Sequence, residues 1–361
     1  MALSQVGLER LHEKVTRKIG QRKNLVINGS MQFAQRGSSV TGLSSSNKVQ
    51  ALDRMFCRIN GAGTWTISQS TESPAGFGHS LKWDCTTADA SPAANDFNYI
   101  SQRFEGQNLQ HLAKGTSGAV KTTLSFHVKS NKTGTFAVLL TDNDNTRQVG
   151  ATYTINAADT WEKKTITFPG DTTGELDDDA AHSMNIIWWM VVGTNRTSGT
   201  AATTWESSDN ANAAVGHNVN MADSTNNEFY ITGIQWEVGN TATDFEQITP
   251  AEEKQLCMRY FQIAGARHCG AVEGSTQFRI LTPLEPEMRG SPTVTVRSGK
   301  TFNTRYQGDT NITNPTLAST RSEPRGVWTG ISTSGKVAGT PIYGRMQQGV
   351  NGDFMDCEAE L

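Results

Sequence analysis

The sequence predicts a mainly β protein with an N-terminal helix, an antiparallel jelly-roll-like β-sandwich, a short connector helix and a smaller C-terminal β-module. Three observations support this prediction. The 361-residue chain contains 34 Gly and many polar turn residues, which suit short strands joined by loops. Many short runs alternate apolar and polar residues, without regular strand–helix alternation, as is typical of a two-sheet sandwich. Eight Trp and 14 Phe indicate packed cores rather than disorder.

Residues 1–23 are expected to form an amphipathic helix with a basic surface. Leu8, Leu11, Val15 and Ile19 recur at helical spacing and make a narrow apolar stripe. A helix of this length is marginal alone and needs a partner. The stripe is therefore predicted to serve oligomerisation or attachment to a larger assembly, with packing on its own domain as the alternative.

Residues 24–249 are predicted to form the sandwich. The stretch KTTLSFHVKSNKTGTFAVLLTD (121–142) indicates a hairpin, with SNKTG as its turn. NIIWWMVV (185–192) is apolar on both faces, which predicts a central strand covered on both sides. Residues 193–227 show little periodicity. YITGIQWEVG (230–239) alternates again and is expected to close the sandwich.

Residues 250–361 are predicted to hold the connector helix and the C-terminal β-module. Thr249 is the expected N-cap, with Pro250 at the first helical position. Strands are expected within TQFRILTPL (276–284), SPTVTVRSG (291–299) and the terminal GDFMDCEAEL. No internal repeat links this module to the sandwich.

Charge and motifs exclude several function classes. The net charge of −3 gives no general case for nucleic-acid binding. No apolar run is long enough to span a bilayer, and no signal peptide is visible at the N-terminus. The five cysteines lack metal or disulfide spacing and are expected to be free, buried thiols.

No catalytic motif stands out. The seven His are scattered, no GxSxG elbow occurs, and no pair of carboxylates is singled out as acid and base. The sequence therefore predicts a non-enzymatic protein without metal or cofactor. Trp205, in a loop of small polar residues, is the candidate for stacking on a sugar ring. The alternative is that Trp205 pins its loop to the sandwich.

Several motifs, in order, carry a resemblance to a family. They are NLVINGSMQFAQRG (24–37), LDRMF (52–56), ISQRFEG (100–106), WEKKTITFPGDTTG (161–174), the stretch from TTWESSDNANAAVGHNVN (203–220) to ITGIQWEVGNTATDFE (231–246), LCMRYFQ (256–262) and PEMRGSPTVTV (286–296). From Asn24 onward the chain resembles bacteriophage tail-fibre or minor virion structural proteins. That family usually has Ala-Asp-Arg-Trp where this chain has Leu-Asp-Arg-Met. The resemblance implies that residues 193–227 are an ordered element.

The resemblance implies a virion protein made in the host cytoplasm. We expect a tail fibre or spike, docked to other virion proteins through the N-terminal helix, that projects β-modules toward a host-surface glycan. Three-fold self-association is the expected oligomeric state. A head-decoration, head-fibre or tail-adaptor protein with a purely structural role is the alternative, and a capsule depolymerase ranks last.

Overall fold

The computed structural model describes residues 22–264, 267–273, 277–297, 301–305, 309–313, 317–332, 341–346 and 355–361. The predicted N-terminal helix, with Leu8, Leu11, Val15 and Ile19, lies outside the described residues. The described chain is mainly β, as the sequence predicts, and every strand pair in it is antiparallel.

The first part of the chain forms strands that belong to one large sheet. They are β1 (Ser39–Val49), β2 (Phe56–Ser70), β3 (Ser80–Thr87), β4 (Phe97–Glu105), β5 (Thr122–Ser130), β6 (Gly134–Asp142), β7 (Arg147–Ile155), β8 (Glu162–Phe168), β9 (His182–Val192), β10 (Glu206–Ser207) and β11 (Glu228–Val238). Short 3-10 helices connect some of them: η1 (Gly106–Asn108), η2 (Gln110–Leu112), η3 (Thr194–Arg196) and η4 (Asn210–Asn212).

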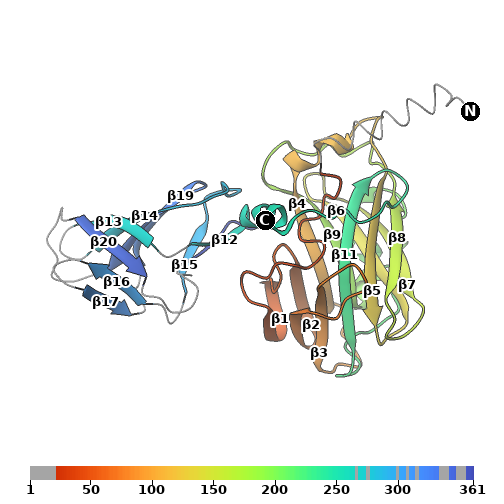
Figure 1. Cartoon of the computed structure of the whole chain (residues 1–361). Coiled ribbons are helices and arrows are strands. Elements are labelled where there is room, and N and C mark those ends of the chain that lie inside the picture. The colour runs from red at the N-terminus through yellow and green to blue at the C-terminus, as the bar shows by residue number, and fades with distance from the viewer. Residues whose placement is uncertain are drawn as a thin grey trace, which may run out of the picture.

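This eleven-stranded sheet folds over into two layers. Its strand order is β10-β7-β6-β9-β4-β2-β3-β11-β5-β8, with β1 paired to β2. Rings from the two halves meet between the layers: Phe126 on β5 lies 5.9 Å from Trp188 on β9, and Phe136 on β6 lies 5.6 Å from Phe229 on β11. The large core therefore lies between two facing layers, and the predicted β-sandwich is confirmed (Figure 1).

Strand β2 passes from one layer to the other. Residues 56–60 pair with β4, whereas residues 64–70 pair with β3. Between them, Gly61, Ala62 and Gly63 all have positive φ, at 74°, 52° and 83°. A side chain at Gly63 would also meet the Thr87 carbonyl oxygen at 2.4 Å, so this bend needs glycine.

Strand β9 is covered on both faces, as predicted. Trp188 points into the large core, and Trp189 belongs to a separate cluster on the outer face. Ala213 and Ala214, from the stretch 193–227, join that second cluster. The stretch of low periodicity is therefore an ordered cover for the outer face of the sheet.

The predicted hairpin at 121–142 is wrong. Both of its strands exist, but β5 pairs with β11 and β8, and β6 pairs with β7 and β9. The apolar faces of β5 and β6 both enter the core, from opposite layers. Alternation revealed which side chains point inward but not which strands lie side by side.

Helix α2 (Pro250–Met258) begins as the sequence predicts. The Thr249 side chain accepts a hydrogen bond from the Glu252 backbone N–H, and the Glu252 side chain binds back to Thr249, which completes a capping box. Cys257, in the last turn of the helix, and Tyr260, just after it, pack with Ile27 in a small cluster of their own. This connector thus rests on the first residues of the sandwich.

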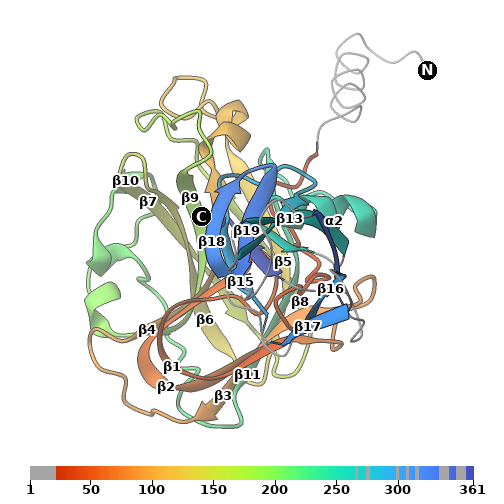
Figure 2. The same cartoon turned by 90° about the vertical axis from the view of Figure 1, so that its left-hand side faces the viewer.

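Two smaller sheets follow the connector. Their strands are β12 (Phe261–Ala264), β13 (Arg267–Glu273), β14 (Gln277–Pro283), β15 (Thr293–Val296), β16 (Thr301–Arg305), β17 (Asp309–Thr313), β18 (Leu317–Glu323), β19 (Gly326–Ser332), β20 (Pro341–Met346) and β21 (Met355–Glu358). A three-stranded sheet has the order β12-β21-β15, and a seven-stranded sheet has the order β17-β16-β20-β13-β14-β19-β18. The three-stranded sheet lies next to the sandwich, and the seven-stranded sheet lies farther out (Figures 1 and 2).

The structure also bears on the cysteines and on membrane-spanning helices. Cys57, Cys85, Cys257 and Cys357 are free and buried, as expected, and Cys269 is a residue whose side chain is not described. Among the described residues, no helix combines the length and apolar character needed to cross a membrane.

Candidate functional site

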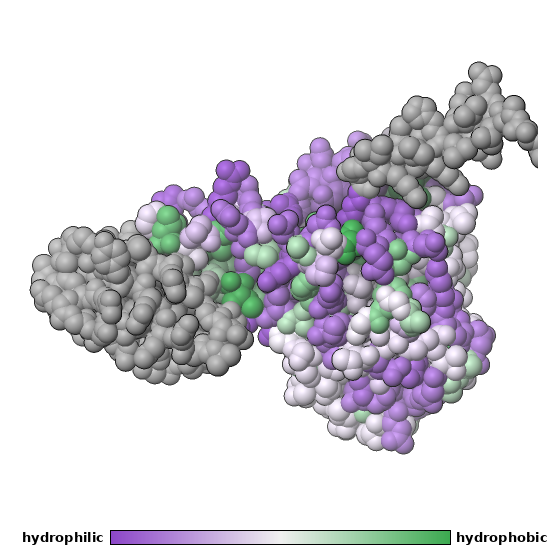
Figure 3. All heavy atoms as spheres, in the orientation of Figure 1, coloured by the Kyte–Doolittle hydropathy of each residue, from purple (hydrophilic) through white to green (hydrophobic). Residues whose placement is uncertain are grey.

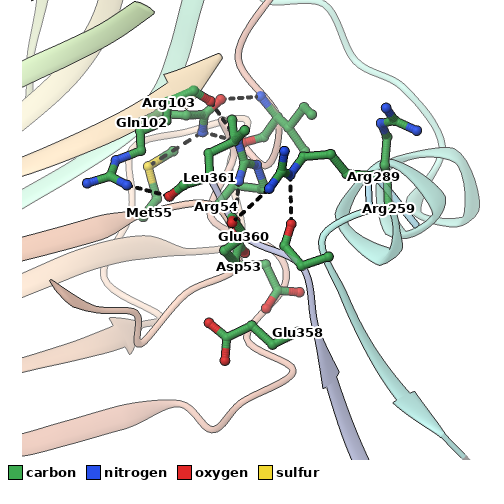
Figure 4. Close-up of polar contacts among 12 residues, drawn as sticks. Asp53, Arg54, Met55, Gln102, Arg103, Arg259, Arg289, Glu358, Glu360 and Leu361 are labelled. Atoms are coloured by element: carbon green, nitrogen blue, oxygen red, sulfur yellow. Dashed lines mark hydrogen bonds and ion pairs between the residues drawn. The ribbon is translucent and has the colours of Figure 1, made fainter. Parts of the chain in front are cut away.

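Five of the motifs that carry the family resemblance (24–37, 52–56, 100–106, 256–262 and 286–296) meet where the sandwich, α2 and the three-stranded sheet come together. We call this cluster the joint. Its members are Gln35, Arg36, Asp53, Arg54, Gln102, Arg103, Glu105, Arg259, Tyr260, Arg289 and residues 359–361, and Figure 4 shows most of them converging from different elements. Segments far apart in sequence are therefore brought together by charged side chains.

Arg54 lies at the centre of the joint. Its side chain is 1% exposed and forms an ion pair with Glu360, 306 residues later in the chain. Its second amino group donates to the Arg103 carbonyl oxygen at 2.6 Å, and its guanidinium lies 3.5 Å from the centre of the Tyr260 ring. Burial alone would lower the pKa of Arg54, but the charge and hydrogen bond of Glu360, together with the nearby Tyr260 and Cys257, raise it overall.

Asp53 ties the start of the sandwich to the same cluster. Its carboxylate accepts hydrogen bonds from the Gln35 backbone N–H at 3.1 Å and the Gln35 side chain at 2.7 Å. Arg36 lies 3.7 Å from Asp53 and 3.1 Å from Glu360, and stacks 3.9 Å from the centre of the Phe261 ring. Burial raises the pKa of Asp53, while the hydrogen bonds from Gln35 act in the opposite direction.

Two more arginines connect the C-terminal part to the sandwich. Arg259, just after α2, donates twice to the buried carboxylate of Glu105, at 3.0 and 2.7 Å. Arg289 donates to the Ala359 carbonyl oxygen at 2.9 Å and also to Ala180 on the sandwich. A buried charge without its partner raises the free energy of the folded state. The charged side chains of the joint are therefore expected to hold this one arrangement.

Side-chain amide groups connect the NLVING motif (24–29) to the sandwich. Each amide makes paired hydrogen bonds to backbone groups, as a neighbouring strand would. Gln102 accepts from the Ile27 N–H and donates to the Ile27 carbonyl oxygen, both at 2.8 Å. Asn24 accepts from the Trp236 N–H at 3.1 Å and donates to the Ile234 carbonyl oxygen at 3.0 Å. The NLVING and QWEVG motifs, more than 200 residues apart in sequence, therefore form one local structure.

The joint anchors both ends of the C-terminal region. The region leaves the sandwich through α2 and β12 and returns through β21, which pairs with both β12 and β15. Residues 359–361 then contact Tyr260, Arg103 and Arg289. The three-stranded sheet is therefore attached to the sandwich on both sides, through α2 and through the last residues of the chain.

The seven-stranded sheet carries an exposed apolar row. Leu281 on β14 is the cross-strand partner of Trp328 on β19, and Trp328 is in turn the partner of Arg321 on β18. Leu281 is 43% exposed and Trp328 is 45% exposed, and they are the only large hydrophobic side chains so exposed among the described residues. Arg321 pairs with the exposed Glu323 at 3.0 Å on the same face. On the face of the molecule drawn in Figure 3, the coloured surface is mostly hydrophilic or neutral, with scattered hydrophobic residues.

Trp205 is fixed to the sandwich by a second charged group, which we call the Lys114 cluster: Lys114, Asp142, Arg147, Asp171 and Trp205. The Lys114 ammonium lies 2.7 Å from Asp142 and 2.9 Å from Asp171, and it sits 4.4 Å from the centre of the Trp205 ring. The Trp205 indole N–H donates to the Pro169 carbonyl oxygen at 2.9 Å. These contacts are those of a loop anchor, and stacking of Trp205 on a sugar stays a prediction.

The sequence singled out neither Arg54 nor Trp328. The Asp53-Arg54 pair within LDRMF was a signal for the joint, because charged residues in an otherwise apolar run need buried partners. Trp328 follows Val327 in GVWTGIS, and alternation places them on opposite faces of β19. The described residues contain no group of His, Cys, Asp and Glu side chains able to hold a metal ion.

Comparisons with known proteins give weak similarities. No family model matches the chain, and no curated protein matches it in sequence. One similar solved structure is the enzymatically active domain of bacteriophage CBA120 tailspike protein 4, with 12% identity over 60% of this chain and a TM-score of 0.30. This chain covers only 21% of that tailspike structure.

Two further similar structures are those of a putative sugar-binding protein and a carbohydrate-binding module. A putative sugar-binding protein from Bacteroides thetaiotaomicron has 14% identity over 60% of this chain and 100% of its own, with a TM-score of 0.35. A family 11 carbohydrate-binding module from Clostridium thermocellum has 10% identity over 57% of this chain and 98% of its own, with a TM-score of 0.29. Similarities at this level establish neither a shared fold nor a shared function.

Proposed function

We propose that this chain is a non-enzymatic bacteriophage virion protein, a tail fibre or spike that binds a host-surface glycan. In this proposal the jelly-roll-like sandwich and the joint hold the seven-stranded sheet outward. The exposed row on that sheet contacts the glycan. The N-terminal helix docks other virion proteins and assembles the chain as a homotrimer. The family resemblance in the motifs from Asn24 onward is the starting point of this proposal.

The exposed Trp328 beside Leu281 is the single observation that favours host attachment over a structural role as a head-decoration protein. Large exposed apolar side chains that lie together commonly mark an interaction site. An indole presents a flat apolar face and an N–H donor, which suits the apolar face of a sugar ring and its hydroxyl groups. Arg321 and Glu323 beside it offer donors and acceptors for those hydroxyls. A purely structural decoration protein has no need of this row.

The joint supports the same proposal. Binding groups are more effective when a rigid scaffold holds them in place. Arg54, Arg259 and Arg289 each bridge the sandwich to the C-terminal region or its connector. Force applied at the outer sheet during attachment would pass through these ion pairs and hydrogen bonds into the sandwich.

Replacing Trp328 with threonine is expected to weaken glycan binding at least about 30-fold, because loss of a central Trp contact typically costs about 2 kcal/mol or more. Threonine keeps β propensity at this exposed position. The measurement is binding of the purified chain to an array of bacterial surface polysaccharides, followed by titration with the best ligand.

Arg325→Ala is the matched control, because Arg325 lies in the adjoining turn and its ion pair with Glu287 is exposed. This control should bind like the unaltered chain, since exposed pairs contribute little. Unchanged binding in Trp328→Thr, or no glycan bound by the unaltered chain, would contradict the proposed function.

A further inference from the structure

The outer face of the sandwich carries a row of cross-strand neighbours that runs from the exposed Arg58 to the buried Trp189. Arg58 on β2 is the direct cross-strand partner of Tyr99 on β4, and Tyr99 is the partner of Trp189 on β9. Cys57 and Ile59 alternate with Arg58 and enter the large core. The row therefore faces away from that core. Arg58 is exposed and Tyr99 is half-buried.

Aromatic rings form the base of this row. Phe97 stacks nearly parallel to Tyr99, at 5.8 Å between ring centres and 13° between planes. Trp189 meets both rings edge-on, at 6.1 Å from Phe97 and 5.2 Å from Tyr99. These rings belong to a packed cluster, so Tyr99 is held in one orientation.

A second guanidinium reaches the same rings from the covering stretch. Arg196, at the end of η3, lies 3.9 Å from the centre of the Phe97 ring, and Arg58 lies 5.3 Å from the same centre. Backbone hydrogen bonds fix η3: Asn195 N–H donates to Ala94 at 2.9 Å, and Ala214 N–H donates to the Arg196 carbonyl at 2.9 Å. The segment that presents Arg196 is therefore set in place before any ligand arrives.

Neither guanidinium has an acidic partner in the part of the chain that the structure describes. Among the described residues, no carboxylate lies within ion-pair distance of Arg58 or Arg196. Burial lowers the pKa of Arg196, and the charge of Arg58 lowers it further. The Tyr99 hydroxyl likewise makes no hydrogen bond with described residues. The Arg58 and Arg196 guanidiniums repel each other, and an anion bound between them would offset this repulsion.

We propose that Arg58, Tyr99 and Arg196 form a second binding site, for a sugar ring that carries a carboxylate. The carboxylate binds the two guanidiniums, whose planar forks match its geometry. The ring lies against Tyr99, whose hydroxyl bonds a sugar hydroxyl. A nucleic acid fits less well, because the chain has a net charge of −3 and gives no broad basic surface. This site is separate from the Trp328 row and does not rest on it.

The test is calorimetric titration of the purified full chain with short oligogalacturonides, and with the same oligomers after full methyl esterification. The ester keeps the sugar ring and removes the charge. The acid form should bind at least about tenfold more tightly than the ester, because a charge-assisted contact typically contributes about a factor of ten or more. Its binding should also weaken as salt is raised.

The variants assign the binding to these residues. Arg58→Gln combined with Arg196→Gln should remove the preference for acid over ester while the melting temperature stays close to that of the unaltered chain. Trp328→Thr should leave the preference intact, which separates this site from the proposed attachment row. The site would be refuted by equal binding of acid and ester, by an unaffected double variant, by no binding of the acid oligomers, or by tighter binding of an oligothymidylate.

Discussion

Replacing Arg54 with alanine is expected to destabilise the folded chain by about 3–5 kcal/mol, because it removes the closer of the two cations that pair with the buried Glu360 carboxylate. Glu360 has a side chain only 6% exposed, and Arg36 at 3.1 Å is its remaining close cation. The substitution also removes the hydrogen bond to the Arg103 carbonyl oxygen and the stacking on Tyr260. Urea denaturation of the purified chain measures the change in free energy of unfolding.

A double substitution tests whether the loss of stability comes from breaking the Arg54–Glu360 ion pair. Arg54→Met together with Glu360→Leu removes both charges and should be less destabilising than Arg54→Ala, since apolar replacement of a buried pair is often tolerated. Arg325→Ala, in an exposed pair, should change stability by less than about 1 kcal/mol. A loss in Arg54→Ala no larger than in Arg325→Ala would show that the joint does not depend on Arg54.

Replacing Lys114 with methionine is expected to destabilise the chain by a similar amount, about 3–5 kcal/mol. Lys114 is the shared partner of the two buried carboxylates of Asp142 and Asp171. Without it, Asp142 keeps no cation within ion-pair distance among the described residues, while Asp171 keeps Arg147 at 2.7 Å. Methionine matches the length of the lysine stem, so the loss would reflect charge rather than a cavity.

The acid dependence of stability provides a second readout for the same cluster. Burial alone would raise the pKa of Asp171, but hydrogen bonds from Arg147 and Lys114 outweigh burial and lower it from 3.8 to about 2. The ionised carboxylate therefore stabilises the folded state by about 2 kcal/mol. This contribution is complete above about pH 4 and is lost as the pH falls through about 2. Between pH 5 and pH 2, Lys114→Met should lose less stability than the unaltered chain, and an equal loss would contradict the assignment.

The fold class could be predicted because it depends on local patterns. Alternation identified several of the strands, the doubly apolar NIIWWMVV identified a strand covered on both faces, and Thr249-Pro250 identified the start of α2. Pairing between strands depends on contacts across the core, and it could not be read from the same pattern. The β5 and β6 strands illustrate this: their connection looks like a hairpin turn, yet it joins opposite layers of the sandwich.

The joint and the exposed row depend on long-range placement. Arg54 is 306 residues from Glu360, and nothing in either local sequence indicates that they meet. Trp205 was singled out because its loop is polar, whereas in the structure its ring covers the Lys114 ammonium. Trp328 lies in a strand that the sequence analysis did not identify, and its exposure is a consequence of an uncovered sheet face.

Antibody labelling of intact virions that carry this chain, viewed by electron microscopy, tests the central proposal most directly. The antibody should be raised against residues 252–361, which include the Trp328 row. The proposed function predicts label at the tail, together with inhibition of adsorption by the same antibody. Label spread over the head, or none on the virion, would contradict it.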